Sequence, residues 1–267
     1  MDNLIDLHES LKTKTYNHGP YQAFKVNDPK PRDIHKASVR DRVLHHALYY
    51  SLSPYFFARF IHDSYSCQDR KGVHRALRRF ETFSRKASQN NTKQCFILKC
   101  DIRKFFASID QKILLKILEK HLTDREVLGL FKIIIQSLRA GLPLGNLTSQ
   151  LLVNVYMNEF DQWMKHVLKV KYYIRYADDF VIFSQNKGES EMLLTKIQFF
   201  LKLNLNLELH PNKVSIETVA SGVDFLGWVH FSDRRVLRTV TKKRMMRRIV
   251  ATESAKATIQ SYFGMLR

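Results

Sequence analysis

The feature that most constrains the fold is the stretch YYIRYADDFVIF (residues 172–183), in which two short aromatic and β-branched runs flank two acids. Such runs predict β-strands, in which successive side chains point to opposite faces of a sheet. Asp178 and Asp179 separate the runs, so we predict a tight hairpin with a two-residue acidic tip. Adjacent carboxylates stand out on a chain whose formal net charge is +19.

Helical and strand-like patterns alternate around this hairpin. The run QCFILKCDI (94–102) predicts a buried strand that ends on Asp101, and GLPLGNLTSQ (141–150) predicts a loop. Helices are predicted at 111–122, 124–140, 151–169 and 189–203, and further strands at 213–219 and 223–229. Strands interleaved with helices, some joined by a hairpin, indicate an α+β fold rather than a doubly wound parallel sheet.

The charge balance indicates a polyanionic partner. The chain carries 44 Lys and Arg against 25 Asp and Glu, and nucleic acid is the simplest match. An anionic membrane surface is the alternative, but no apolar run reaches about 18 residues. The acidic start, MDNLIDLHES, does not resemble a signal peptide. We therefore expect a cytoplasmic protein with no membrane partner.

Cysteine and histidine give no support for a zinc site. Cys67, Cys95 and Cys100 show no CxxC spacing, and the eleven histidines form no HxxxH pattern. Buried, reduced thiols are the simpler interpretation of the three cysteines.

Three acids at the ends of strand-like runs form the candidate catalytic cluster: Asp101, Asp178 and Asp179. Clustered carboxylates repel one another unless a cation lies between them. Hard divalent cations such as Mg²⁺ prefer such oxygen ligands. Two of them, about 3.5–4 Å apart, can clamp the attacking and leaving oxygens of a phosphoryl transfer. The alternative is that Asp178 and Asp179 form an ordinary polar turn.

The YADD of this hairpin resembles the catalytic box of reverse transcriptases, and further boxes follow in that family's order. These are RDIHKASVRDR (32–42), SYSCQDRKGVHRAL (64–77), CDIRKFFASID (100–110), GLPLGNLTSQ (141–150), LELHPNKVSIE (207–217) and GVDFLGWV (222–229). The resemblance extends from about residue 28 to the end of the chain, and is closest to bacterial reverse transcriptases. It implies an RNA-directed DNA polymerase that makes cDNA.

The resemblance also implies a right-hand polymerase, with an antiparallel palm sheet packed on helices. Its expected parts are fingers (1–95), palm (96–110), helices between fingers and palm (111–139), palm with catalytic hairpin and primer grip (140–230), and the basic start of a thumb (231–267). Because only 37 residues follow His230, we expect a short or incomplete helical thumb that is truncated, unusually compact or completed by a partner.

Residue roles follow from the same resemblance. Asp101 and Asp178 would bind two Mg²⁺ ions, or Mn²⁺ instead, with the carbonyl of Ile102 and with Asp179 as further ligands. Lys213 would act on the pyrophosphate leaving group, or is an ordinary surface lysine.

Other residues would contact the nucleotide and the primer. Phe106 would exclude a ribose 2′-OH, or is a core aromatic beside Phe105. Arg70 and Lys71 would bind the triphosphate, or belong to a solvated face. The primer-grip candidates are Leu226, Gly227 and Trp228, of which Trp228 is also plausible as core.

The tail is the most basic part of the chain, with eight Lys or Arg among residues 234–248. It is either a nucleic-acid contact or a solvated charged face. The nucleic-acid candidates are Arg234, Arg235, Arg238, Lys242, Lys243, Arg244, Arg247 and Arg248.

The segment GLPLGNLTSQ (141–150), here called the nucleotide loop, resembles the loop that lies under the incoming nucleotide in this family. Its sequence departs from the commonest pattern of the family. Leu144-Gly145 stands where most members have Gln-Gly, and Ser149-Gln150 where they have Ser-Pro. LGNLTSQ resembles the enzymes of diversity-generating retroelements, which misincorporate opposite template adenines. Leu144 removes a hydrogen-bonding group from the pocket, and polar contacts discriminate better than apolar packing. Leu144, Gly145 and Gln150 are therefore nucleotide-binding candidates.

That resemblance implies as partners a template RNA, a primer or cDNA strand, deoxynucleoside triphosphates and a basic accessory protein. Two alternatives stay open. One is a defence-associated or retron-like reverse transcriptase that copies its own non-coding RNA. The other is a non-catalytic RNA-binding relative, against which the intact Asp101, Asp178 and Phe106 argue.

Overall fold

The structure, a computed structural model, describes residues 2–27, 31–251, 259–260 and 262–264. The helices are α1 (Asp2–Lys12), α2 (Val39–Phe57), α3 (Val73–Ala87), α4 (Phe105–Ser108), α5 (Gln111–His121), α6 (Arg125–Gln136), α7 (Leu147–Gln162), α8 (Lys187–Leu205) and α9 (Thr239–Ala251), with a π-helix, η1 (Trp163–Val167), directly after α7. The strands are β1 (Gln22–Val26), β2 (Arg32–Lys36), β3 (Phe96–Asp101), β4 (Tyr173–Tyr176), β5 (Asp179–Ser184), β6 (Ser215–Thr218), β7 (Val223–Phe225), β8 (Trp228–His230) and β9 (Arg235–Leu237).

A four-stranded sheet in the order β4-β5-β3-β6 forms the centre of the molecule. All of its neighbouring strands are antiparallel. A β1–β2 hairpin and a three-stranded β7-β8-β9 sheet are also antiparallel. The predicted α+β class is therefore confirmed, since no parallel doubly wound sheet is present among the described residues.

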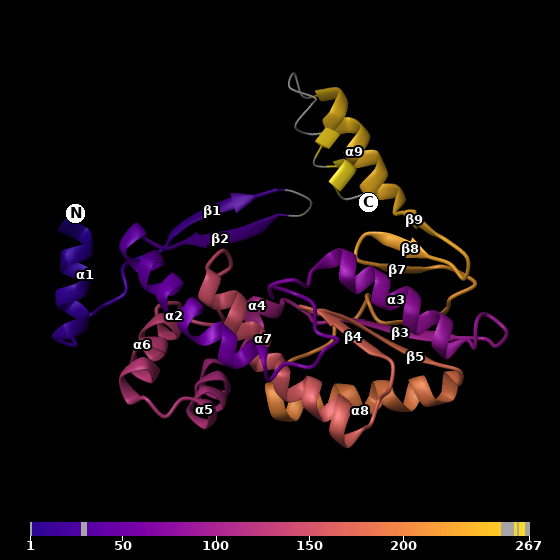
Figure 1. Cartoon of the computed structure of the whole chain (residues 1–267), viewed down its shortest axis with the longest axis horizontal. Coiled ribbons are helices and arrows are strands. Elements are labelled where there is room, and N and C mark those ends of the chain that lie inside the picture. Colours follow the sequence, from indigo (N-terminus) through magenta and orange to yellow (C-terminus); the bar gives the residue numbers. More distant parts are fainter. Residues whose placement is uncertain (1, 28–30, 252–258, 261, 265–267) are drawn as a thin grey trace.

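Helices cover both faces of the central sheet, with α3 on one face and α8 on the other (Figure 1). Because strand side chains alternate, Leu98 and Phe180 pack into the core formed with α7 and α8, while Ile97 and Val181 pack into a second core. The second core also contains residues of α3 and of the β7-β8-β9 sheet. Two covered faces hold the strands rigidly, so groups at the end of the sheet have fixed positions.

The acidic hairpin differs from its sequence prediction by one residue. Tyr176 of β4 pairs with Asp179 of β5, so the two-residue turn is Ala177-Asp178, and Asp179 already belongs to the strand. Ala177 adopts a left-handed conformation with φ of 55°. The reason is tertiary: Asp179 also pairs with Asp101 of β3, which extends β5 toward the turn.

The predicted loop 141–150 is also shorter than expected, because α7 begins at Leu147. Asn146 occupies the N-cap position, a common place for this residue, although its side chain makes no capping bond. Its amide instead donates to the carbonyl of His35 on β2. The helix predicted at 151–169 becomes α7 followed by η1, and the strand predicted at 223–229 becomes β7 and β8.

The predicted thumb region begins with β9 and α9, which leads away from the rest of the molecule (Figure 1). That prediction extends over residues 252–258, 261 and 265–267, which lie outside the described residues. Across the described part of the chain, no helix has the length and apolar character needed to cross a membrane.

Candidate active site

The three predicted catalytic acids converge at one end of the central sheet. Asp101, the last residue of β3, is the direct cross-strand partner of Asp179. Residues opposite each other in antiparallel strands have Cβ atoms about 5 Å apart. Asp178 lies in the adjoining turn, and its carbonyl accepts a hydrogen bond from the amide of Ile102 at 3.2 Å. Ile102 is thereby held beside the acids, and it forms an isolated bridge with Leu209.

Burial and mutual repulsion raise the pKa values of two of these acids. Burial raises the pKa of Asp178, and the Asp101 charge adds to this, while Lys213 and Arg32 oppose it. Burial, followed by the charges of Asp178 and Asp101, raises the pKa of Asp179 to about 7. Groups held in this way favour a bound cation, because it lowers the cost of keeping them ionised.

Lys213 is a positively charged side chain in contact with this cluster. Its ammonium Nζ lies 2.6 Å from Oδ2 of Asp101, which is buried at the sheet end. Within the described ranges, no group of three or more His, Cys, Asp or Glu side chains is arranged to hold a metal ion. The all-oxygen donor set nevertheless fits a hard divalent cation. A metal would therefore compete with Lys213 for Asp101.

Phe106 lies on α4, five residues after Asp101. Its ring is half-buried and packs edge-on against the fully buried Phe105, with ring centroids 5.6 Å apart. Its carbonyl accepts a hydrogen bond from Leu142 at 2.8 Å. Gly141, at φ +68°, lies so close that a Cβ there would be 2.6 Å from that carbonyl oxygen. The nucleotide loop is thus seated directly on the backbone of Phe106.

The other end of the nucleotide loop is attached to the β1–β2 hairpin. The carbonyl of Leu144 accepts a hydrogen bond from His35 at 2.9 Å, and Asn146 Nδ2 donates to the His35 carbonyl at 2.9 Å. A Cβ on Gly145 would lie 2.8 Å from Ile34 Cγ2. Gln150 is placed on the first turn of α7, not in the loop.

Lys71 does not point to a site for a triphosphate. Its ammonium donates to the backbone carbonyls of Ile61, His62 and Ser64, at 3.3, 2.9 and 2.8 Å. Burial lowers the pKa of Lys71. The side chain therefore closes its own loop, while Arg70 is exposed, with φ of 58°.

Arg32 is a candidate that sequence reasoning missed. It begins β2, and its positive charge lowers the pKa of Asp178, against the larger effect of burial. The signal was present in the basic segment KPRDIHK, but nothing in the sequence distinguished Arg32 from its basic neighbours.

The primer-grip candidates form the turn between β7 and β8. Leu226 and Gly227 both have positive φ, 51° and 84°, as a two-residue hairpin turn of type I′ requires. Trp228 is buried in the second core, and the Arg235 guanidinium lies 5.1 Å from its ring centroid. The core alternative for Trp228 is therefore what the structure shows.

The basic tail divides into two parts. Arg234, Arg235 and Arg238 pair with Asp233, Glu81 and Asp224, at 3.0, 2.8 and 2.5 Å. The remaining candidates lie on α9, where Arg244 is half-buried and the others are exposed: Lys242, Lys243, Arg247 and Arg248. Helix α9 and the β1–β2 hairpin lie on the same side of the central sheet (Figure 1).

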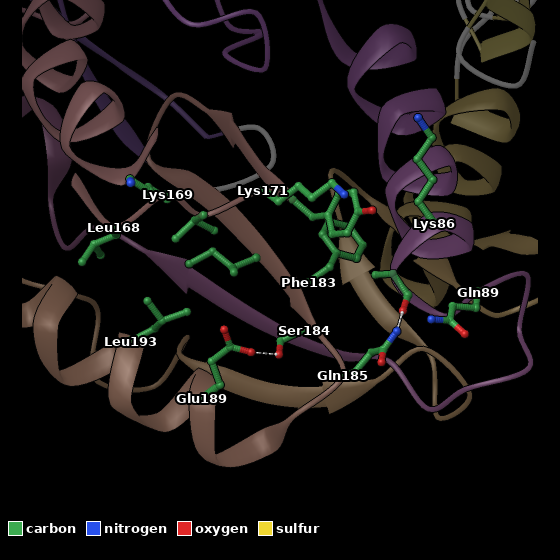
Figure 2. A pocket seen from close by; sticks show the side chains of 14 residues that line it. Lys86, Gln89, Leu168, Lys169, Lys171, Phe183, Ser184, Gln185, Glu189 and Leu193 are labelled. Carbon is green, nitrogen blue, oxygen red and sulfur yellow. Dashed lines mark hydrogen bonds between the residues drawn. The ribbon is translucent and has the colours of Figure 1, made fainter. Parts of the chain in front are cut away.

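A separate cavity lies at the opposite end of β5 from Asp179 (Figure 2). Residues from the end of α3, the η1–β4 connection and α8 line it, including Lys86, Lys171 and Leu193. Ser184 donates to Glu189 and Gln185 to the carbonyl of Ala87 at its edge. None of the predicted site residues lines this cavity.

An antiparallel sheet with acids converging at one end, in a chain with a net charge of +19, fits the class of nucleic-acid polymerases. The comparison with known families places it further: residues 25–230 match the family "Reverse transcriptase (RNA-dependent DNA polymerase)". The chain therefore belongs to the reverse transcriptase family.

One curated protein also matches the chain in sequence. The chain is 23% identical over 281 residues to Protein YkfC of Escherichia coli (strain K12), an alignment that covers 84% of this chain and 72% of YkfC.

Among solved structures, apo telomerase from Candida tropicalis matches with a TM-score of 0.59 at 12% identity, covering 85% of this chain and 52% of that one. The same telomerase truncated from its C-terminal domain gives 0.58 at 10% identity, with coverages of 88% and 59%. Telomerase from Candida albicans, in complex with a TWJ fragment of telomeric RNA, gives 0.53 at 13% identity, with coverages of 74% and 37%. This chain thus spans 37–59% of those three chains. The likeness shows the polymerase fold.

Proposed function

We propose that this protein is an RNA-directed DNA polymerase that extends a primer with deoxynucleotides on a template RNA. The observation that carries the proposal is the convergence of Asp101, Asp178 and Asp179 beside Lys213, in a chain of the reverse transcriptase family. The net charge of +19 fits partners that are polyphosphates.

Asp101 and Asp178 would hold two divalent cations, with Asp179 and the carbonyl of Ile102 as further ligands. We propose Mg²⁺, with Mn²⁺ as the alternative. Bound ions of this kind activate the attacking hydroxyl and stabilise charge on the phosphates. Lys213 would leave Asp101 and present its ammonium to the departing pyrophosphate, where a proton and a positive charge both help.

The nucleotide would lie between α4, the nucleotide loop and β2. The half-buried Phe106 ring would occupy the space of a ribose 2′-OH and so select deoxynucleotides by clash. Arg32, whose charge acts on Asp178, is a better candidate for the triphosphate than Lys71, whose ammonium donates to three backbone carbonyls. Leu144, Gly145 and Gln150 would contact the base pair being formed.

The nucleic acid would contact the turn Leu226-Gly227 and the exposed basic residues of α9. Arg234, Arg235 and Arg238 would contribute where they project from the β9 region, although each also has an acidic partner.

The biological setting we propose is a diversity-generating retroelement, with a structured template RNA and a basic accessory protein as partners. The support is Leu144, an apolar side chain in a loop that the β1–β2 hairpin holds in place. A pocket without a hydrogen-bonding amide at this point would tolerate more mispairs.

Primer extension on a defined RNA template, with Mg²⁺ and the four deoxynucleotides, tests the activity. We expect extension by the wild type and its loss in Asp178→Ala, by at least about a thousandfold, because the cation ligand is removed. Glu191→Ala is the control, since it removes an exposed carboxylate of α8 whose partner, Lys187, is not a candidate site residue.

Sequencing of the product separates the possible settings. Errors concentrated opposite template adenines support a diversity-generating enzyme, and evenly distributed errors favour a defence-associated or retron-like one. RNA binding without extension by the wild type would contradict the proposed catalysis and favour a non-catalytic RNA-binding protein.

A further inference from the structure

Arg175 is a fully buried arginine whose side chain is shared among several parts of the molecule. It lies on β4, and its Nε and Nη2 atoms make a two-pronged ion pair with Asp161 of α7, at 2.8 and 2.6 Å. Both side chains are completely inaccessible to solvent, and Tyr173 donates to the same carboxylate at 2.7 Å. Burial alone would lower the pKa of Arg175, but Asp161 raises it, so the guanidinium stays charged.

The remaining donors of Arg175 reach the turn that carries Asp178. Nη1 donates to the carbonyl of Ala177 at 3.1 Å. Ala177 has φ of 55°, a left-handed conformation that costs a residue with a Cβ roughly 1 kcal/mol or more. A charged donor on its carbonyl stabilises that conformation. The guanidinium thus holds the residue that immediately precedes Asp178.

Arg175 also bonds to residues 63–71, a segment within the predicted fingers. The Arg175 amide donates to the carbonyl of Asp63, and its carbonyl accepts from Tyr65, both at 3.0 Å. Nη2 of Arg175 also donates to Ser64 Oγ at 3.1 Å. Ser64 in turn accepts the Lys71 ammonium on its carbonyl.

A third branch leads to α7 below the nucleotide loop. Nη1 of Arg175 donates to Asn154 Oδ1 at 3.2 Å. The Asn154 amide donates to the carbonyls of Gln150 and Ser66, at 3.1 and 3.0 Å. One guanidinium therefore connects the catalytic turn, the segment 63–71 and the start of α7.

We propose that Arg175 is a positioning residue, which sets Asp178 relative to the segment 63–71 and Gln150 without touching substrate. A buried ion pair seldom adds much stability over an apolar pair of the same size, so its retention is better explained by the geometry that it specifies. Misplacement of a reacting group by about 1 Å can cost on the order of a hundredfold in rate. Loosening this network should therefore reduce catalysis more than it reduces substrate binding.

Arg175→Lys is the principal test. Lysine keeps a charge for Asp161, but its single ammonium cannot reach Ala177, Asn154 and Ser64 together. Tyr173→Phe is the matched control, because it removes a buried hydrogen bond to the same carboxylate and leaves the bond to Ala177 intact. Should Arg175→Lys fail to fold, the double variant Arg175→Gln/Asp161→Asn removes the bond to Ala177 without burying an unpaired charge.

Two readouts are measured on variants that circular dichroism shows to be folded. In single-nucleotide extension, which depends on the proposed function, we expect kcat to fall by about ten- to a hundredfold, with KM for the primer–template within about threefold. For Tyr173→Phe, kcat should stay within about twofold of the wild type. In hydrogen–deuterium exchange, which does not require activity, peptides covering 176–180 and 63–71 should exchange at least about tenfold faster in the Arg175 variant only.

Equal kcat and equal exchange in the Arg175 and Tyr173 variants would overturn the proposal, because Arg175 would then only fill the core. If the wild type does not extend primers, the proposed function fails. The exchange measurement still decides the role of Arg175 in that case.

Discussion

At the scale of single residues, the contact between Lys213 and Asp101 is the most consequential one in the site. The ammonium lies 2.6 Å from a carboxylate that faces two further acids. Part of the cost of gathering these charges is thus offset by the protein's own cation. Under the proposed function, a divalent metal on Asp101 would compete with the Lys213 ammonium for this carboxylate.

Lys213→Met tests this competition directly. We expect metal-free protein to bind Mn²⁺ several-fold more tightly than the wild type does, because no ammonium has to be displaced and the carboxylates repel one another more strongly. Isothermal titration calorimetry measures the affinity without any need for turnover. Lys99→Met is the control, since Lys99 also acts on Asp179 but makes no ion pair with Asp101. An unchanged or weaker affinity in Lys213→Met would show that Lys213 does not block the metal.

At the scale of elements, the nucleotide loop depends on its contact with α4. Gly141 permits this contact, since it combines φ of +68° with an approach that leaves no room for a Cβ beside the backbone of Phe106 and Ala107. A shift of Phe106 would therefore move the loop, and a shift of the loop would move Phe106. The proposed selection against ribose thus depends on the position of the loop.

Gly141→Ala should separate this packing from a general effect of glycine. We expect a loss of about 2 kcal/mol or more in the free energy of unfolding, because the new methyl group meets backbone atoms in a strained conformation. Gly129→Ala in α6 is the matched control: its Cβ would meet nothing within 4 Å, so the same substitution should stabilise by roughly 0.5–1 kcal/mol. Urea denaturation measures both, and equal effects at the two positions would contradict this account.

At the scale of the whole molecule, the basic residues of α8 and α9 differ in their surroundings. Helix α9 carries exposed cations on the side of the sheet where the β1–β2 hairpin lies, whereas α8 covers the opposite face (Figure 1). Two of the three lysines of α8 have acidic partners: Lys187 pairs with Glu191 and Lys202 with Glu208. We therefore expect nucleic acid to bind along the α9 side.

The salt dependence of RNA binding tests this arrangement. Replacing Lys242, Lys243 and Arg247 with Gln should weaken binding and reduce the slope of log K against log salt by about 2, since each phosphate contact contributes about 0.7 for a single strand. Replacing Lys187, Lys196 and Lys202 of α8 with Gln changes net charge equally and should leave the slope nearly unchanged. Fluorescence anisotropy over a series of salt concentrations measures both, and equal slopes would mean that only total charge matters.

Much of this arrangement could be predicted from local pattern. The strand ending at Asp101, the acidic hairpin and the amphipathic helices all follow from periodicity, because a half-buried element must repeat its apolar residues at its own period. The order of the boxes implied the family, and the match over residues 25–230 confirms it. The α+β class followed from the alternation of strands and helices, which the antiparallel central sheet bears out.

Other features were decided by contacts between segments distant in sequence. The turn lies at Ala177-Asp178 and not at Asp178-Asp179, because β3 pairs with β5 as far as Asp179. The Lys71 ammonium points into its own loop, because three backbone carbonyls there accept its hydrogen bonds. Nothing in the sequence pattern predicted that Arg175 is buried, and its burial depends on the ion pair with Asp161, fourteen residues earlier in the chain.

The sequence by itself therefore determined the elements and the chemical character of the site, because period and residue type are local properties. The tertiary structure alone decided which charges neutralise one another, since electrostatic energy in a buried site depends on distance and burial, which no local pattern contains.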